Sequence, residues 1–151
     1  MAAMAVDQPP ARPTLKEYEG EGIVVTWEPT FCIHAQHCVR GLPTVFDRAR
    51  RPWIEPGAAE ADRIAEVIER CPSGALGYRR TDGRAGERVA EGIEVDAEPN
   101  GPLHLRGRIR IADEAGRVIR EATRVTLCRC GQSANKPFCD RTHERVGWRS
   151  S

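Results

Sequence analysis

The chain has 151 residues, of which only 29 are leucine, isoleucine, valine or phenylalanine, so it can fold but has little material for a core. Its formal net charge of +1 gives no basic field for nucleic acid, and no apolar run approaches the roughly 20 residues of a membrane span. Small proteins with thin cores usually need disulfides, metals or oligomerisation, and this chain has six cysteines.

The predicted elements begin with an arm. Residues 1–20 contain several prolines and show no hydrophobic periodicity, which predicts a disordered segment. The first residues have neither the basic nor the apolar region of a secretory signal, so we expect a soluble, cytoplasmic protein. Cysteines in such a protein more often bind metals or act in catalysis than form disulfides.

The next elements form one small predicted unit. Residues 23–27 predict a strand, and the apolar residues of segment 58–70 share one helical face, which predicts the main helix. Pro72 ends this helix. Between the strand and the helix we expect a cysteine-containing loop over residues 31–43 and two short extended segments, at 45–46 and 53–54.

A charged, glycine-containing segment over residues 79–98 predicts a linker. Beyond it, alternating apolar and charged residues predict a hairpin with strands at 103–111 and 117–127 and a turn at 113–116. The predicted fold class is α+β, with a small ferredoxin-like unit containing one main helix and a β-rich cluster-binding unit. The predicted domains are the arm at 1–20, a first unit at 21–78, the linker at 79–98 and a second unit at 99–151.

The last three cysteines and a histidine form a set of candidate metal ligands. Cys128 and Cys130 are two residues apart, so in an extended segment their side chains point the same way. Cys139 and His143 are four apart, which predicts one face of a helical turn that Pro137 is suited to begin. Three cysteines and one histidine are also a common structural zinc set, although zinc-finger spacings usually begin C-x2–4-C rather than C-x-C.

This segment resembles the mitoNEET-like CDGSH iron–sulfur family over residues 99–148. The ligand spacings, Ser133 and the run from Lys136 to Asp140 carry the resemblance. It implies a [2Fe-2S] cluster whose ligands are Cys128, Cys130, Cys139 and His143, supported by Ser133, Pro137 and Asp140. Arg141 departs from the family pattern, which usually has glycine at this position.

A second set of cysteines consists of Cys32, Cys38 and Cys71. Bacterial ferredoxins have a C-x2-C-x2-C run and a remote Cys-Pro pair. The three cysteines fit that frame, but Ala35 stands where the central cysteine would be. Together with its flanking residues, the segment 22–78 resembles the divergent single-cluster ferredoxin family, which implies a bound cluster. The alternative is that one or more of these thiols are buried and inert.

The missing central cysteine leaves two cluster types open. Three cysteines suit a [3Fe-4S] cluster, whereas a [4Fe-4S] cluster needs a fourth ligand, for which we favour His34 over His37. The alternative for either histidine is a polar loop residue that hydrogen-bonds the backbone. We interpret Trp27 and Trp53 as core residues.

The sequence shows no catalytic serine triad, phosphate-binding loop or paired carboxylates, so we predict a protein that is not an enzyme. Two clusters favour electron transfer or redox relay between partner redox proteins. A first alternative is redox or pH sensing, or cluster storage and delivery, because a histidine ligand must be neutral to bind metal. A second is a zinc-stabilised binding module. We expect no nucleic-acid or membrane partner, and a homodimer is an option. Because the core is thin, we also predict that each unit folds around its cluster.

Overall fold

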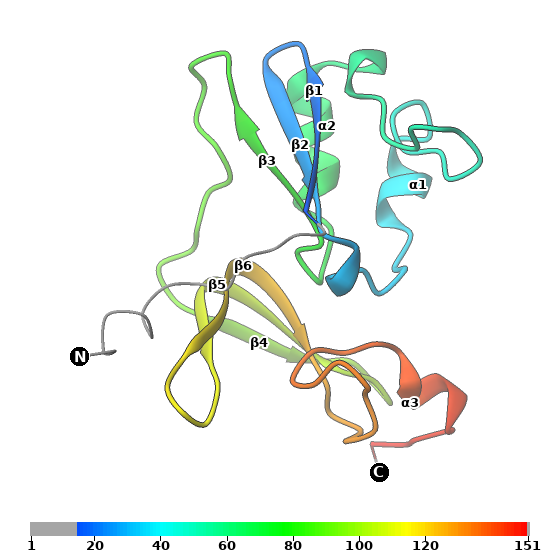
Figure 1. Cartoon of the computed structure of the whole chain (residues 1–151), viewed down its shortest axis with the longest axis vertical. Coiled ribbons are helices and arrows are strands. Elements are labelled where there is room, and N and C mark those ends of the chain that lie inside the picture. Colours follow the sequence, from blue (N-terminus) through cyan, green and yellow to red (C-terminus); the bar gives the residue numbers. More distant parts are fainter. Residues whose placement is uncertain (1–14, 151) are drawn as a thin grey trace. The chain divides into compact units, whose positions relative to one another are not determined.

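The computed structural model describes residues 15–150, which divide into two compact units between Arg88 and Val89 (Figure 1). Each unit has one three-stranded antiparallel sheet, and three short α-helices occur within residues 15–150. The fold class is therefore α+β, as predicted. None of the helices in this described range is both long and apolar enough to cross a membrane.

The first unit is built on a sheet with the strand order β1-β2-β3. Its strands are β1 (Lys16–Gly20), β2 (Ile23–Trp27) and β3 (Leu76–Arg80). The central strand β2 ends with Trp27 opposite Leu76, and the N–H of Glu28 donates to the Ala75 carbonyl at 2.8 Å. This pairing brings the end of β2 close to the segment that contains Cys71. The helical elements are η2 (Pro29–Phe31), α1 (His37–Gly41), η3 (Pro56–Ala58) and α2 (Ala61–Ile68).

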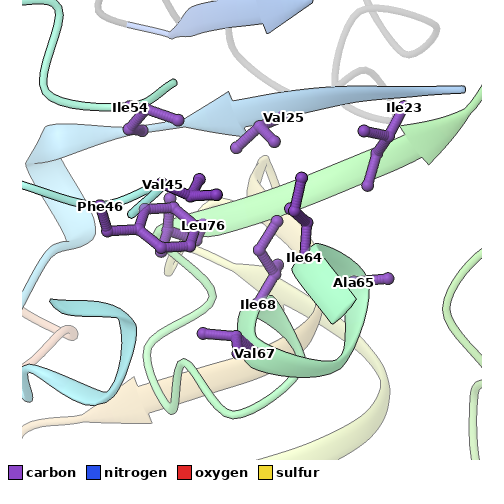
Figure 2. Packing of buried hydrophobic residues seen from close by; sticks show 10 residues of the cluster. All are labelled: Ile23, Val25, Val45, Phe46, Ile54, Ile64, Ala65, Val67, Ile68 and Leu76. Carbon is purple, nitrogen blue, oxygen red and sulfur yellow. The ribbon is translucent and has the colours of Figure 1, made fainter. Parts of the chain in front are cut away.

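The first unit has a continuous hydrophobic core. The periodicity that predicted the main helix places Ile64, Val67 and Ile68 on its buried face. Ten buried residues pack together between this helix, the sheet and the two segments around Phe46 and Ile54 (Figure 2). They are Ile23, Val25, Val45, Phe46, Ile54, Ile64, Ala65, Val67, Ile68 and Leu76. Cys38 and Cys71 pack against the edge of this core and do not form its centre.

The second unit has a sheet with the order β4-β5-β6 and a much thinner core. Its elements are β4 (Glu94–Ala97), β5 (Leu103–Ala112), β6 (Val118–Leu127) and α3 (Thr142–Arg145). The described part of this unit has few buried apolar side chains: Ile109, Val118, Val125 and Phe138, with Cys139. Its stability must therefore depend on something other than apolar burial.

Two edge strands correct the predicted organisation. Residues 16–20 form β1, so the predicted arm is wrong there, and residues 1–14 lie outside the described part of the chain. Residues 94–97 form β4 inside the predicted linker and belong to the second unit. Both strands are predominantly exposed and join their sheets mainly through backbone pairing. The predicted strand at 23–27 and the predicted hairpin are confirmed.

Candidate metal centres

The three cysteines of the first unit line one pocket. Cys32 follows η2, Cys38 lies in α1, and Cys71 follows α2, with its N–H donating to the Ile68 carbonyl at 2.9 Å. Burial raises the pKa of Cys38 to about 11, and the nearby Cys71 and Cys32 thiols raise it further. The three sulfurs thus lie around one pocket and influence one another. Such thiols release their protons when they bind a metal, so this donor set fits an iron–sulfur cluster.

The two histidines of this loop are placed differently. His34 lines the pocket with its Nδ1 atom 3.9 Å from the Cys32 Sγ, but Arg48 lies 2.7 Å from the same nitrogen. An arginine only donates, so Nδ1 is the acceptor and the neutral ring has its proton on Nε2. His34 is thus beside the thiols with its Nδ1 atom occupied by Arg48. His37 begins α1 and also lines the pocket, as does Ala35.

The four ligand candidates of the second unit form two close pairs. The Sγ atoms of Cys128 and Cys130 are 3.8 Å apart, and the Cys139 Sγ is 3.9 Å from the Nδ1 of His143. Two sulfurs bound to one tetrahedral metal at about 2.3 Å are about 3.8 Å apart. Each pair therefore has the spacing of two ligands on one metal atom.

The two pairs lie close to one another, because their segments are joined by backbone hydrogen bonds. Burial raises the pKa of Cys139, and the nearby thiols of Cys128 and Cys130 raise it further. Within residues 15–150, no group of three or more Cys, His, Asp or Glu side chains is drawn together tightly enough to hold a single metal ion. The chemistry of the set, three thiols and an imidazole, fits the [2Fe-2S] ligands that the sequence predicts.

Backbone pairing holds the two ligand-bearing segments together. The N–H of Cys128 donates to the Pro137 carbonyl at 2.8 Å, and the N–H of Cys139 donates to the Thr126 carbonyl at 3.0 Å. The predicted supporting residues lie in this framework. The Ser133 hydroxyl donates to the Phe138 carbonyl at 2.6 Å.

Asp140, another of the predicted supporting residues, holds the segment from Ala134 to Thr142 together through hydrogen bonds. One of its carboxylate oxygens accepts from the Ala134 N–H at 2.9 Å and the other from the Thr142 N–H at 3.0 Å. Hydrogen bonding by the Thr142 side chain lowers the pKa of Asp140 to about 2, against the effect of burial, so the group is ionised at neutral pH. The carboxylate thus joins the two ends of the segment that contains Cys139.

The predicted helical turn from Pro137 is wrong. Helix α3 begins only at Thr142, so Cys139 precedes the helix and His143 lies within it. The chain bends at Arg141, whose φ of 68° lies in the left-handed region that favours glycine. This conformation explains why glycine suits the position. Arg141 adopts it while its side chain donates to the Glu144 carboxylate at 2.8 Å.

Backbone donors surround the thiols. The N–H of Gln132 donates to the Cys130 Sγ and that of Arg141 to the Cys139 Sγ, both at 3.3 Å. Burial alone would raise the pKa of Cys128, but the N–H groups of Ser133 and Gly131 help to outweigh it, so that the pKa falls below its ordinary value. Donors of this kind stabilise negative charge on cluster sulfurs.

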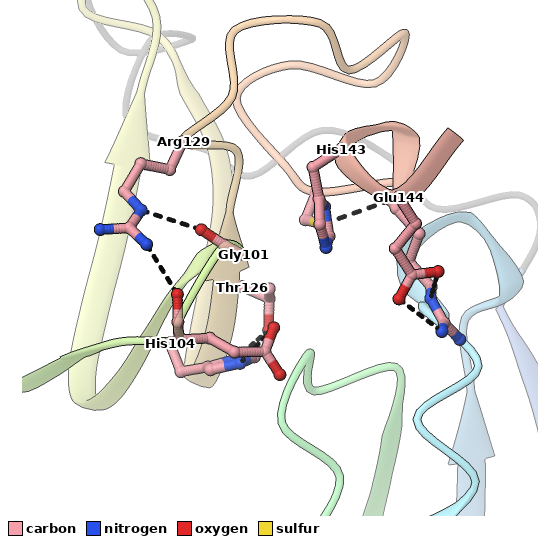
Figure 3. A network of polar contacts seen from close by, with 9 residues as sticks. Gly101, His104, Thr126, Arg129, His143 and Glu144 are labelled. Carbon is pink, nitrogen blue, oxygen red and sulfur yellow. Dashed lines mark hydrogen bonds and ion pairs between the residues drawn. The ribbon is translucent and has the colours of Figure 1, made fainter. Parts of the chain in front are cut away.

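Sequence analysis missed Arg129, which lies between two ligand cysteines. Its guanidinium donates to the Gly101 carbonyl at 2.9 Å (Figure 3). It also donates to the Glu98 carbonyl at 2.6 Å and lies over the Trp148 ring at 5.1 Å. It joins the segment between Cys128 and Cys130 to the β4–β5 connection and to the C-terminal segment that contains Trp148. No motif distinguishes this arginine from the other twenty.

A pocket of about 310 Å³ opens next to His143. Glu98, Asn100 and Trp148 are among its lining residues. His143 itself is only 8% exposed, so the pocket gives solvent access to a largely buried imidazole.

Comparisons with known proteins find an iron-binding family over each of the two segments that contain the cysteines. A family model described as "Divergent 4Fe-4S mono-cluster" matches residues 18–81, and one described as "Iron-binding zinc finger CDGSH type" matches residues 100–144. The chain is also 44% identical over 62 residues to the uncharacterized protein YjdI of Escherichia coli strain K12, covering 41% of this chain and 82% of that protein. YjdI of Escherichia coli O157:H7 matches to the same extent. Both predicted family resemblances are confirmed.

Proposed function

Because the chain belongs to the divergent 4Fe-4S mono-cluster family and also has a CDGSH-type iron-binding domain, we propose that it holds two iron–sulfur clusters and passes electrons between partner proteins. The observation that supports the proposal is that each unit brings its own candidate ligands together. The first unit has three thiols in one pocket, and the second unit has two close pairs of candidate ligands. The proposed role needs no catalysis by the chain itself. The existence of partner redox proteins stays a prediction, as does the possible homodimer.

The first ligand set supports a cluster bound by three thiolates. Cys32, Cys38 and Cys71 supply the sulfurs for a [3Fe-4S] cluster directly. A [4Fe-4S] cluster requires another ligand at its fourth iron, and His34 must leave Arg48 to present its Nδ1 atom there. The hydrogen bond from Arg48 therefore favours the three-thiolate form.

The second ligand set supports a [2Fe-2S] cluster with one histidine. Cys128 and Cys130 would bind one iron, and Cys139 with His143 the other. Replacing a thiolate by a neutral imidazole lowers the negative charge on the cluster and raises its reduction potential. The backbone N–H donors around the thiols act in the same direction.

We expect the cluster of the second unit to be reduced before that of the first. A stepwise reductive titration of the holoprotein, followed by low-temperature EPR, should show the signal of a reduced [2Fe-2S] cluster developing at the higher potential. Cys128→Ala, which removes one of its ligands, provides the control because it should abolish that signal. Reduction of the other cluster first would contradict the proposed order of the two reduction potentials.

A second candidate function is acid-responsive release or delivery of the second cluster. The pocket beside His143 favours it, because solvent protons can reach the imidazole and a protonated imidazole cannot bind iron. We expect a His143→Cys variant to keep its iron and to lose the cluster more slowly in mild acid, followed as bleaching of visible absorbance.

Unchanged acid lability in this variant would remove the argument for acid sensing. Delivery is tested separately by mixing the wild-type holoprotein with an apo-ferredoxin. Transfer of iron and sulfide would support a delivery role. If the cluster stays in place, delivery is ruled out and electron transfer remains as the proposed function.

A further inference from the structure

Two tryptophans line the same pocket as the three thiols of the first unit. The Nε1 atoms of Trp27 and Trp53 are buried, and neither makes a hydrogen bond to any atom within the described range 15–150. A buried donor without a partner is unfavourable, and indole N–H groups in protein interiors usually have an acceptor. An acceptor that belongs in this pocket is a cluster sulfur.

The packing of the two rings accounts for at most one of these donors. Their centroids are 4.9 Å apart and their planes are inclined at 74°, so one ring presents its edge to the face of the other. In such a pair only the edge-on ring can direct its N–H at the π face of its neighbour. At least one indole N–H therefore still lacks an acceptor.

Trp27 is held in one position by several contacts. It ends strand β2, paired with β1 and β3, and Lys16 lies over its ring at 5.4 Å. Trp53 is fixed in turn by Phe46, whose ring centroid is 5.9 Å from that of Trp53. Neither ring is placed to turn its N–H towards solvent, because both nitrogen atoms are buried.

Trp27 is also close enough to Cys32 to influence its thiol. Burial raises the pKa of Cys32, and the N–H of His34, the charge of Arg48 and the indole of Trp27 each act to lower it. Trp27 and Cys32 also line the same pocket, so an acceptor for the unpartnered indole N–H is available at this sulfur. Trp53 packs instead against Phe46 of the hydrophobic core.

We propose that the indole N–H of Trp27 donates a hydrogen bond to the sulfur of Cys32 when this cysteine binds iron, and thereby raises the reduction potential of the first cluster. The inference rests on the proposed function, because it requires a cluster at Cys32, Cys38 and Cys71. A donor to a ligand sulfur withdraws negative charge and so favours the reduced cluster. Trp27 is then a positioning and tuning residue, not a core filler alone.

The test compares two matched holoprotein variants, Trp27→Phe and Trp53→Phe. Each keeps an aromatic ring and removes one N–H. In Trp27→Phe, the ratio of reduced to oxidised first cluster at a fixed potential should fall about three- to tenfold, where tenfold corresponds to about 59 mV for one electron. Trp53→Phe should change this ratio less than twofold. The cluster of the second unit should be unaffected in both. Equal ratios in Trp27→Phe and wild type would overturn the proposal.

A measurement on wild-type holoprotein keeps the test decisive if Trp27→Phe does not bind iron. The protein is labelled with ¹⁵N at the indole nitrogens and studied by electron–nuclear double resonance of the paramagnetic first cluster. The spectrum should show coupling of the cluster to one ¹⁵N nucleus and to the exchangeable proton bound to it. The same coupling must persist in labelled Trp53→Phe. A first cluster that is present without this coupling overturns the role of Trp27, whereas absence of any cluster signal from this unit overturns the proposed function instead.

Discussion

Replacing Cys139 with alanine is expected to unfold the second unit while the first unit stays folded. The second unit has few buried apolar residues, and Cys139 is itself one of its most buried side chains. The segments that contain the ligands are otherwise joined by hydrogen bonds around a loop. Metal binding at structural sites contributes on the order of 10 kcal/mol, which exceeds the stability of a typical small domain.

Hydrogen exchange of the purified variant measures this effect directly. Amides of β5 and β6 should lose their protection, whereas those of β2 and β3 should keep it. Gln132→Ala is the control, because it removes an exposed side chain from the same loop and leaves the backbone N–H that donates to Cys130. Full protection of β5 and β6 in Cys139→Ala would show that the hairpin is stable without its cluster.

Replacing Cys38 with alanine should abolish the first cluster without unfolding the first unit. Cys38 lies at the edge of the hydrophobic core, and ten buried residues pack without needing the thiols. We expect a loss of stability of about 1 kcal/mol from this truncation, against about 3–5 kcal/mol for Phe46→Ala, which removes a fully buried ring.

Iron content, EPR and thermal unfolding of the two variants distinguish these outcomes. Cys38→Ala should lack the signal of the first cluster and still unfold cooperatively, whereas Phe46→Ala should unfold at a much lower temperature. If Cys38→Ala lost its tertiary structure as completely as Phe46→Ala, the first unit would depend on its cluster for folding. The sequence predicts that both units fold around a cluster. From the structure, we expect this dependence on a cluster only for the second unit.

The elements predicted from sequence are those with a strong local pattern. The helix α2 followed from one apolar face, and the hairpin β5–β6 followed from alternation around a turn in which the Asp113 side chain accepts from the N–H groups of Ala115 and Arg117. Strands β1 and β4 were missed because both lie at sheet edges with predominantly exposed, polar side chains. These strands pair through the backbone groups of a neighbouring strand. Such pairing does not require alternating apolar side chains, so it produces no periodic pattern in the sequence.

The proximity of the candidate ligands was predictable from their spacing, but their surroundings were not. Cys128 and Cys130 are close because an extended segment places alternate residues on one side. In contrast, the contact of Arg48 with His34 and the position of Trp27 in the pocket depend on residues brought together from distant parts of the first unit. The start of α3 was misplaced because Arg141 adopts a backbone conformation that its residue type disfavours.

Metal and sulfide analysis of anaerobically purified protein tests the central claim most directly. Two clusters predict a coloured protein with about five or six irons and about six sulfides per chain, no stoichiometric zinc, and EPR signals from two distinct centres. A signal present in the protein as isolated would identify [3Fe-4S] at the first site, and one that appears only on reduction would identify [4Fe-4S]. A colourless protein with stoichiometric zinc and no sulfide would contradict the account.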